Sequence, residues 1–178
     1  LQIPATTVIP PSIGFHDENN PGNGFDPERA KELLDEAGFI DVDGDGFRED
    51  AEGNELILNY AAMSGGEASE PIATHYIQNW EDVGIKVELF NGRLHEYMAF
   101  YDLLGTDEPG IDLYSGGWSV GSDPDPSGIH GRTAAYNFTR YTSDKNDELL
   151  AAGTSEKAFD LDYRKDIYNQ WQELVRDE

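Results

Sequence analysis

The chain has 178 residues, with 36 Asp and Glu against 12 Lys and Arg, and its formal net charge is −24. Such a surface cannot neutralise phosphates, which makes nucleic acid a poor partner, and anionic lipid headgroups would repel it. The absence of Cys excludes disulfides, thiolate metal sites and a Cys nucleophile. Eight Phe, nine Tyr and three Trp supply apolar area for a folded core. No stretch approaches the ~20 apolar residues of a membrane span, so we expect no direct membrane insertion.

The two ends of the sequence predict a piece of a longer protein. The first residues lack the basic and apolar regions of a signal peptide. The last residues, 172–178, stop within a helical pattern that has no terminating Gly. We expect an extended entry segment over residues 1–26, followed by an α/β lobe over residues 27–178.

Helical and strand patterns alternate along the chain after the entry segment. Periodicity predicts helices near residues 27–36, 68–83 and 94–104, strands near 56–62, 85–90 and 111–115, a loop over 116–143, and two helices over 144–178. The strand–helix–strand unit has the length of a parallel crossover. The sequence therefore predicts an α/β fold, with a mixed or mainly parallel sheet flanked by helices.

An acidic loop between the first helix and the first strand fits the calcium-loop pattern D-x-D-x-D-G-x5-E. The candidate ligands are Asp41, Asp43, Asp45, the carbonyl of Phe47, and Glu52. Alternate carboxylates at this spacing can converge on one hard cation, while Gly46 permits the sharp turn. This loop is therefore a candidate Ca²⁺ site, and a bound ion would hold the loop in place.

A second interpretation of the acidic loop is a solvated turn that links helix to strand. Glu52 is followed by Gly53 and a strand, not by an exiting helix. Residues 48–56 could fold as a hairpin that carries Glu52 away from the three Asp residues. Both interpretations stay open at the level of sequence.

A glycine-rich segment, residues 116–126 (GGWSVGSDPDP), directly follows the third predicted strand. In open α/β sheets, ligands bind beyond the carboxyl ends of strands. The candidate ligand-binding residues are Gly117, Trp118, Ser119, Asp123 and Asp125. The glycine allows close backbone approach, the indole offers a flat wall, and a carboxylate suits a cationic amine. The alternative is that Trp118 belongs to the core and the Asp-Pro pairs form turns.

Four segments, in this order, resemble the extracytoplasmic oligopeptide- and dipeptide-binding proteins of bacterial ABC importers, solute-binding protein family 5. The segments are residues 25–39 (FDPERAKELLDEAGF), 43–49 (DGDGFRE), 77–87 (IQNWEDVGIKV) and 162–168 (DYRKDIY). The segment from Trp118 to Pro126, with Asn137 and Tyr141 beyond it, is similar to the ligand-side loop of that family.

This resemblance implies most of the second lobe of a two-lobed protein with a type II periplasmic-binding-protein-like fold, which closes on a peptide. It implies a periplasmic or lipid-anchored cell-surface location, an oligopeptide ligand and an ABC permease as partner. In the family, a Trp and an Asp three residues later face the peptide, and the Asp pairs with its α-amino group. Trp118 matches, whereas the Asp position holds Gly121, so we expect Asp123 to take that role.

The resulting prediction is a substrate-binding lobe of a peptide-import receptor that is not an enzyme and requires no cofactor. The alternative is a calcium-dependent extracellular surface or adhesion module, based on the acidic loop. A hydrolase has only scattered Ser, His and Asp in its favour, without a G-x-S-x-G elbow. Since family members also carry nickel complexes, haem or sugars, the ligand class stays open at this stage.

Overall fold

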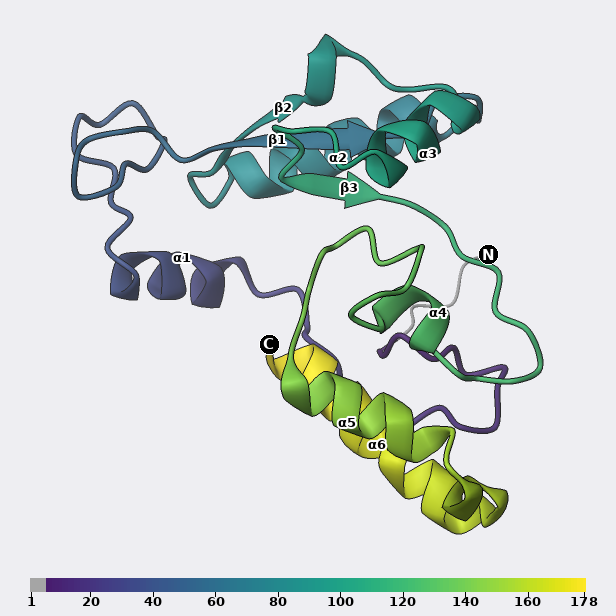
Figure 1. The fold of residues 1–178 in the computed structure, drawn as a ribbon. Coiled ribbons are helices and arrows are strands. Elements are labelled where there is room, and N and C mark those ends of the chain that lie inside the picture. The colour runs from purple at the N-terminus through teal and green to yellow at the C-terminus, as the bar shows by residue number, and fades with distance from the viewer. Residues whose placement is uncertain (1–5) are drawn as a thin grey trace. The chain divides into compact units, whose positions relative to one another are not determined.

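The computed structural model describes residues 6–178, which form two compact units (Figure 1). Phe25–Gly117 form the first, which we call the sheet unit. The second, which we call the helical unit, joins the residues up to Gly24 with Trp118–Glu178.

The sheet unit contains the three strands formed within residues 6–178, and they pair in parallel. Its elements are α1 (Pro27–Glu36), β1 (Ile57–Ala62), α2 (Ser69–Glu81), β2 (Lys86–Leu89), the 3-10 turn η1 (Phe90–Gly92), α3 (Tyr97–Gly105) and β3 (Leu113–Ser115). The strand order is β2-β1-β3, with Ile57 opposite Lys86 and Tyr60 opposite Leu113. A helix lies between successive strands in the sequence, which is the connection that parallel strands need. The predicted α/β class with a mainly parallel sheet is therefore confirmed.

Packing in the sheet unit places a narrow face of α2 against the strands. Side chains of β1, β2 and the segment before β2 form the buried cluster, joined by Ala73 of α2. Ile77 packs against this cluster, one turn beyond Ala73. The other large apolar residues of α2, Ile72, Tyr76 and Trp80, stay 43%, 45% and 39% exposed. The helical period was predicted correctly, but the small side chain of Ala73 marks the face that meets the sheet.

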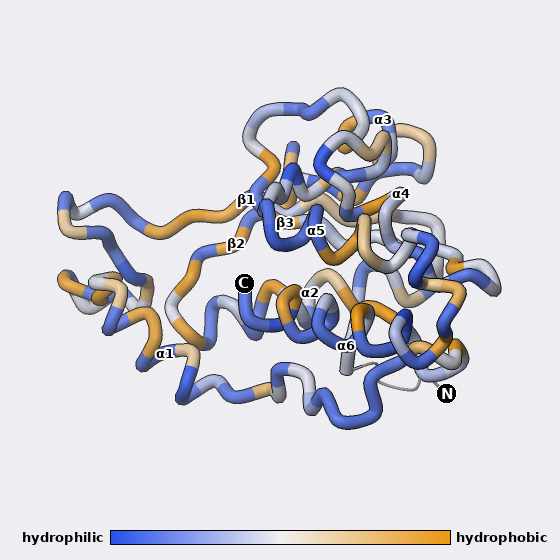
Figure 2. Tube along the Cα trace, turned by 60° about the horizontal axis from the view of Figure 1, so that its bottom comes forward, coloured by the Kyte–Doolittle hydropathy of each residue, from blue (hydrophilic) through white to orange (hydrophobic). Residues whose placement is uncertain are grey.

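The helical unit consists of helices and connecting loops. Its elements are α4 (Ser127–His130), α5 (Asp144–Gly153), the 3-10 turn η2 (Glu156–Phe159) and α6 (Leu161–Asp177). The carboxylate of Asp160 caps α6 by accepting the N–H groups of Asp162 and Tyr163. Figure 2 shows α6 as alternating orange and blue, because its apolar residues recur at helical spacing. The short helix α4 lies within the segment that the sequence predicted as loop.

The core of the helical unit joins the two ends of the chain. Tyr168 and Trp171 of α6 are 0% exposed, and Ile9 from the entry segment packs against them. Gln172 adds polar links, because its side chain donates to the carbonyl of Phe15 and accepts from the hydroxyl of Thr7. The structure thus groups residues 6–24 with Trp118–Glu178, whereas the sequence predicted an entry segment over 1–26 and one lobe over 27–178. That both units belong to one lobe stays a prediction.

Gly153 allows a close helix contact in this core, and we predict that Gly153→Ala destabilises the protein. A Cβ at this position would lie 2.4 Å from Cε1 of Tyr168. Helix propensity alone would favour Ala by about 1 kcal/mol. Overpacking costs about 1–3 kcal/mol, so we expect the melting temperature to fall. Gly105→Ala in α3 is the control, since nothing lies within 4 Å of its Cβ position. Equal melting temperatures for Gly153→Ala and the unmodified protein would contradict the prediction.

Candidate ligand-binding site

The structure divides the predicted ligand-side segment between the two units. Gly117 ends the sheet unit, where its carbonyl accepts a hydrogen bond from the Tyr101 hydroxyl at 2.9 Å. Residues 118–126, which we call the site loop, belong to the helical unit. Ser119 is exposed within it. Every candidate ligand-binding residue except Gly117 therefore lies in the helical unit.

Trp118 begins the site loop as a half-exposed wall, not as a core residue. Its side chain is 50% exposed, and its ring centroid lies 5.1 Å from that of Tyr136. Tyr136, also 50% exposed, lies 6.0 Å from the Phe138 ring at an interplanar angle of 83°. These three rings, the aromatic row, expose flat apolar area with polar edges. Trp118 was predicted from the sequence, whereas Tyr136 was missed because no motif marks it.

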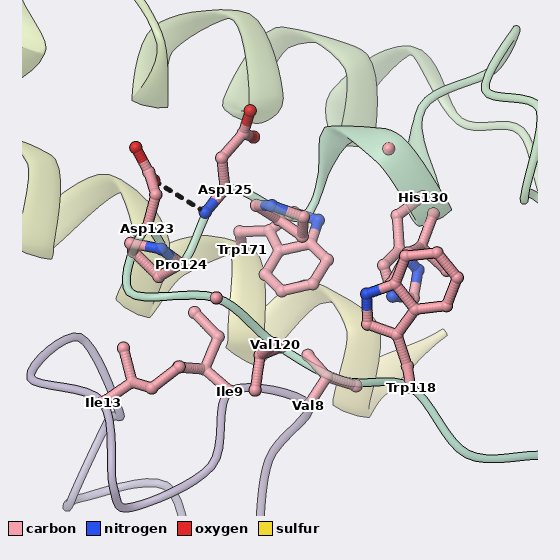
Figure 3. Close-up of a pocket in the computed structure, with 14 residues that line it drawn as sticks. Val8, Ile9, Ile13, Trp118, Val120, Asp123, Pro124, Asp125, His130 and Trp171 are labelled. Atoms are coloured by element: carbon pink, nitrogen blue, oxygen red, sulfur yellow. Dashed lines mark hydrogen bonds between the residues drawn. The ribbon is translucent and has the colours of Figure 1, made fainter.

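Beside Trp118 lies a cavity of about 100 Å³ with a mostly apolar lining (Figure 3). The entry segment supplies Val8, Ile9 and Ile13, and α6 supplies Trp171. The site loop and α4 complete the wall with Trp118, Val120, Gly121, Asp123, Pro124, Asp125, Pro126, Gly128, Ile129 and His130. In Figure 3 the carboxylates of Asp123 and Asp125 point away from the three aliphatic side chains of the entry segment. The cavity is therefore apolar inside and acidic on one side.

Asp123 is already engaged by a cation of the protein itself. Its Oδ1 accepts a hydrogen bond from Arg164 Nη2 at 2.7 Å and another from the backbone N–H of Asp125 at 3.0 Å. The expected pairing of Asp123 with a ligand amine thus competes with an internal ion pair. The sequence alone did not reveal this pair, because Arg164 lies 41 residues further along the chain.

Asp125 accepts hydrogen bonds from Ser127, the first residue of α4, and keeps one oxygen available. Its Oδ1 accepts from the backbone N–H and the hydroxyl of Ser127, at 3.0 and 2.6 Å. Among the residues that the structure describes, no cationic side chain pairs with Asp125 and no donor reaches its Oδ2. Asp125 is therefore the carboxylate of the site loop that is best placed for an external cation.

His130 closes α4 against the buried indole of Trp171, with ring centroids 5.0 Å apart. The carbonyl of His130 accepts from the Asn146 side chain at 2.8 Å, and Asn146 in turn accepts from Trp171 Nε1 at 2.9 Å. Burial lowers the pKa of His130, because the cationic form loses hydration there. The imidazole is therefore neutral at pH 7.

The lowered pKa of His130 predicts acid-sensitive stability of the helical unit. The unfolded chain takes up the His proton near the ordinary value of 6.5, whereas the folded chain takes it up only at lower pH. This contribution to stability is present above pH 6.5 and is lost as the pH falls through the folded pKa. Urea unfolding between pH 7.5 and 5 should show this loss, and His130→Gln should reduce it. His75→Gln, which removes an exposed imidazole of α2, is the control. An identical pH profile for His130→Gln and the parent would contradict the prediction.

The loop after α4 is held by Asn137, which is 3% exposed. Its side-chain amide donates to the carbonyls of Gly131 and Tyr141, at 3.2 and 2.9 Å. Asn137 and Tyr141, both part of the family resemblance, thus close one loop on itself and hold the segment that carries Tyr136.

In the sheet unit, the acidic loop brings together the three Asp residues but not Glu52. Carboxylate oxygens of Asp41, Asp43, Asp45 and Glu49 lie within 4.8 Å of one another. Gly44 and Gly46 have φ values of +84° and +101°, which other residues rarely adopt. Both donate their N–H groups to the carboxylate of Asp41.

Glu49 lies with the three Asp residues in place of the expected Glu52, because residues 48–56 form the hairpin of the second interpretation. Bridges of Glu49 to Ile40 and to Glu55 fix the hairpin, and its turn carries Glu52, whose N–H donates to Asp50. Glu49 is 6% exposed and accepts the N–H of Val42 at 2.8 Å. The N–H of Phe47 donates to Asp45, and a role for its carbonyl stays a prediction.

Calcium binding by this loop also stays a prediction, which thermal melting can test. Calcium at a hundred times its Kd should add roughly 2.7 kcal/mol to the free energy of unfolding, which raises the melting temperature by several degrees. We expect Asp43→Asn and Glu49→Gln to abolish this shift, and Glu52→Gln to keep it. If calcium does not raise the melting temperature of the parent chain, the loop is a solvated turn and not a calcium site. If the shift is lost in Glu52→Gln and kept in Glu49→Gln, Glu52 is the ligand, as the sequence pattern predicted.

The fold defined by these elements is that of periplasmic solute-binding proteins. A structure of lactococcal OppA, complexed with an endogenous peptide in the closed conformation, matches with a TM-score of 0.86 and 33% identity, covering 97% of this chain and 33% of that one. An oligopeptide-binding protein from Thermus thermophilus, complexed with a pentapeptide, matches with a TM-score of 0.83, covering 100% of this chain and 32% of that one. At 21% identity, the second likeness shows the fold alone.

Sequence comparison identifies the family. The model for bacterial extracellular solute-binding proteins, family 5 (middle region), matches residues 1–163. The chain therefore belongs to this family. The oligopeptide-binding protein OppA of Lactococcus lactis subsp. lactis is 36% identical over 180 residues, which cover 97% of this chain and 29% of that protein. The oligopeptide-binding protein AppA of Bacillus subtilis is 24% identical over 159 residues, 86% of this chain and 28% of that protein.

These comparisons confirm the resemblance stated from the motifs. They also set its extent, because the chain spans less than a third of the length of these two relatives. Proteins of the matching family are extracellular by description, and the relatives are named as binding proteins. Over residues 6–178, the structure has no helix whose length and apolar character would suit a membrane crossing.

Proposed function

We propose that the chain is part of the second lobe of an ABC-importer receptor, which captures oligopeptides outside the cell and delivers them to a membrane permease. Support comes from the family and from the names of relatives such as OppA of Lactococcus lactis. In this proposal the protein binds and releases its ligand without catalysis and without a required cofactor. A lipid anchor on the complete receptor is part of the same proposal. The family assignment favours this function over a calcium-dependent adhesion module.

The observation that carries the proposal is the combination of an aromatic row, an apolar cavity and a free carboxylate oxygen in one unit. Trp118 and Tyr136 are half exposed, which gives an extended peptide a flat surface to lie on. A cavity of about 100 Å³ beside Trp118 suits an aliphatic side chain better than an aromatic ring, since an engineered apolar cavity of about 150 Å³ holds one benzene.

Asp125 supplies the charged contact of the proposal. A ligand ammonium on Asp125 Oδ2 would form a charge-assisted hydrogen bond, which is about twice as strong as a neutral one. The acceptor already has a fixed position, because Oδ1 of the same carboxylate is held by Ser127. We therefore assign the amine contact to Asp125 and not to the internally paired Asp123.

Calorimetric titration of the complete receptor with short peptides tests the assignment. Trp118→Ala should weaken binding by roughly tenfold or more, as expected when an anchoring Trp is truncated. Asp125→Asn should weaken binding of peptides with a free α-amine more than binding of the same peptides acetylated at the N-terminus. Glu173→Gln, an exposed carboxylate of α6 outside the site, is the matched control. Equal losses for free and acetylated peptides would remove the assignment of Asp125.

The isolated 178-residue chain should bind peptide weakly or undetectably, because one lobe supplies only part of the contacts of a closed receptor. Micromolar binding to this chain in the same titration would overturn that expectation.

A further inference from the structure

Arg164 of α6 joins three segments of the helical unit through one guanidinium group. Nη2 donates to Asp123 Oδ1 at 2.7 Å, and Nε donates to the carbonyl of Gly153 at 3.0 Å. The same group lies 5.4 Å from the Phe15 ring centroid and 5.2 Å from that of Tyr168. The site loop, the end of α5 and the entry segment thus meet at one side chain.

The surroundings of Arg164 make its position well defined. Its side chain is 17% exposed, and Nη2 also donates to the hydroxyl of Tyr168 at 3.2 Å. The planar, forked guanidinium can donate in several fixed directions and stack on rings at the same time, which an ammonium cannot do. Asp123 is 65% exposed, so the ion pair itself is worth little more than a surface pair. Its importance lies in where it holds the carboxylate.

A hydrogen bond links the carboxylate of Asp123 to the backbone of Asp125, so the position of Asp123 also restrains Asp125. Oδ1 of Asp123 accepts the N–H of Asp125, whose own Oδ1 accepts the N–H of Ser127 at the start of α4. Pro124 and Pro126, which flank Asp125, are buried and have restricted φ values. A side chain anchored at Arg164 therefore determines the position of both carboxylates in the site loop.

We propose that Arg164 is a positioning residue that determines the charge selectivity of the site: it neutralises Asp123 and holds Asp125 in place, so that the site loop offers one unpaired carboxylate to a ligand. This inference rests on the proposed function. The receptor then accommodates peptides with one cationic group at this position, and a second cation nearby gains nothing. Loss of the Arg164 charge converts the loop into a site with two carboxylates.

The test of selectivity compares two peptides that differ by one charge. The complete receptor is titrated with a tetrapeptide that has a free α-amine and Lys at its second position, and with the same peptide carrying Nε-acetyl-lysine. The ratio of the two Kd values reports on the second cation only. Arg164→Met should shift this ratio by roughly two- to fivefold in favour of the lysine peptide, the range of exposed ion pairs. Asp123→Asn in the Arg164→Met background should return the ratio to that of the parent.

A purely structural role of Arg164 predicts another result, because weaker folding lowers the affinity for both peptides equally. Arg164→Lys keeps the positive charge without the fork, so it should leave the ratio unchanged even where it weakens binding. An unchanged ratio in Arg164→Met, or the same shift in Arg164→Lys, would overturn the charge role.

Hydrogen exchange on the 178-residue chain tests the positioning role without any ligand. The N–H groups of Asp125 and Ser127 should exchange several-fold faster in Arg164→Met and in Asp123→Asn, and no faster in the double variant. Unchanged exchange in Arg164→Met would overturn the positioning role. A receptor that binds neither peptide would contradict the proposed function and the charge selectivity that depends on it, while the exchange result would still decide the positioning role.

Discussion

Burial of the Trp171 indole is the constraint on which the helical unit depends. The side chain is 0% exposed and packs with Ile9 of the entry segment, and its Nε1 donates to Asn146 of α5. Asn146 in turn holds the carbonyl of His130, where α4 ends. A polar indole group in a core needs such a partner, since an unsatisfied donor costs about 1–3 kcal/mol. One buried ring therefore positions the entry segment and two helices around the cavity.

The binding features lie on the exposed side of this arrangement. Trp118 and Asp125 keep exposed surface, while Arg164 and Trp171, which hold the surrounding segments together, are mostly or fully buried. Under the proposed function, a ligand gains contact area and a charged hydrogen bond without rearranging the core. The ion pair of Asp123 with Arg164 has a related effect. Because Asp123 is already paired within the protein, it needs no cation from a ligand.

The features that could be predicted from the sequence are those that depend on residues close together in the chain. The strands and their parallel pairing followed from alternation and crossover length, and the ordered motifs singled out Trp118, which lines the cavity of the helical unit. The features that could not be predicted depend on residues far apart or on strand register. Thr7 pairs with Gln172, 165 residues away, and such contacts place the entry segment in the helical unit. Glu49 replaces Glu52 because a hairpin register, on which the 12-residue calcium pattern contains no information, decides which side chain faces the Asp residues.

Under the proposed function, the net charge of −24 contributes to ligand capture in a more limited way than its size suggests. Screening reduces the range of exposed charges to about 8 Å at physiological ionic strength. The field of the whole chain therefore speeds the approach of cationic ligands of any kind but does not distinguish among them. Selection requires a carboxylate at contact distance, and in the site loop the pairing of Asp123 with Arg164 leaves Asp125 in that position. Under the proposal, charge selectivity is determined by this one ion pair and not by the composition of the surface.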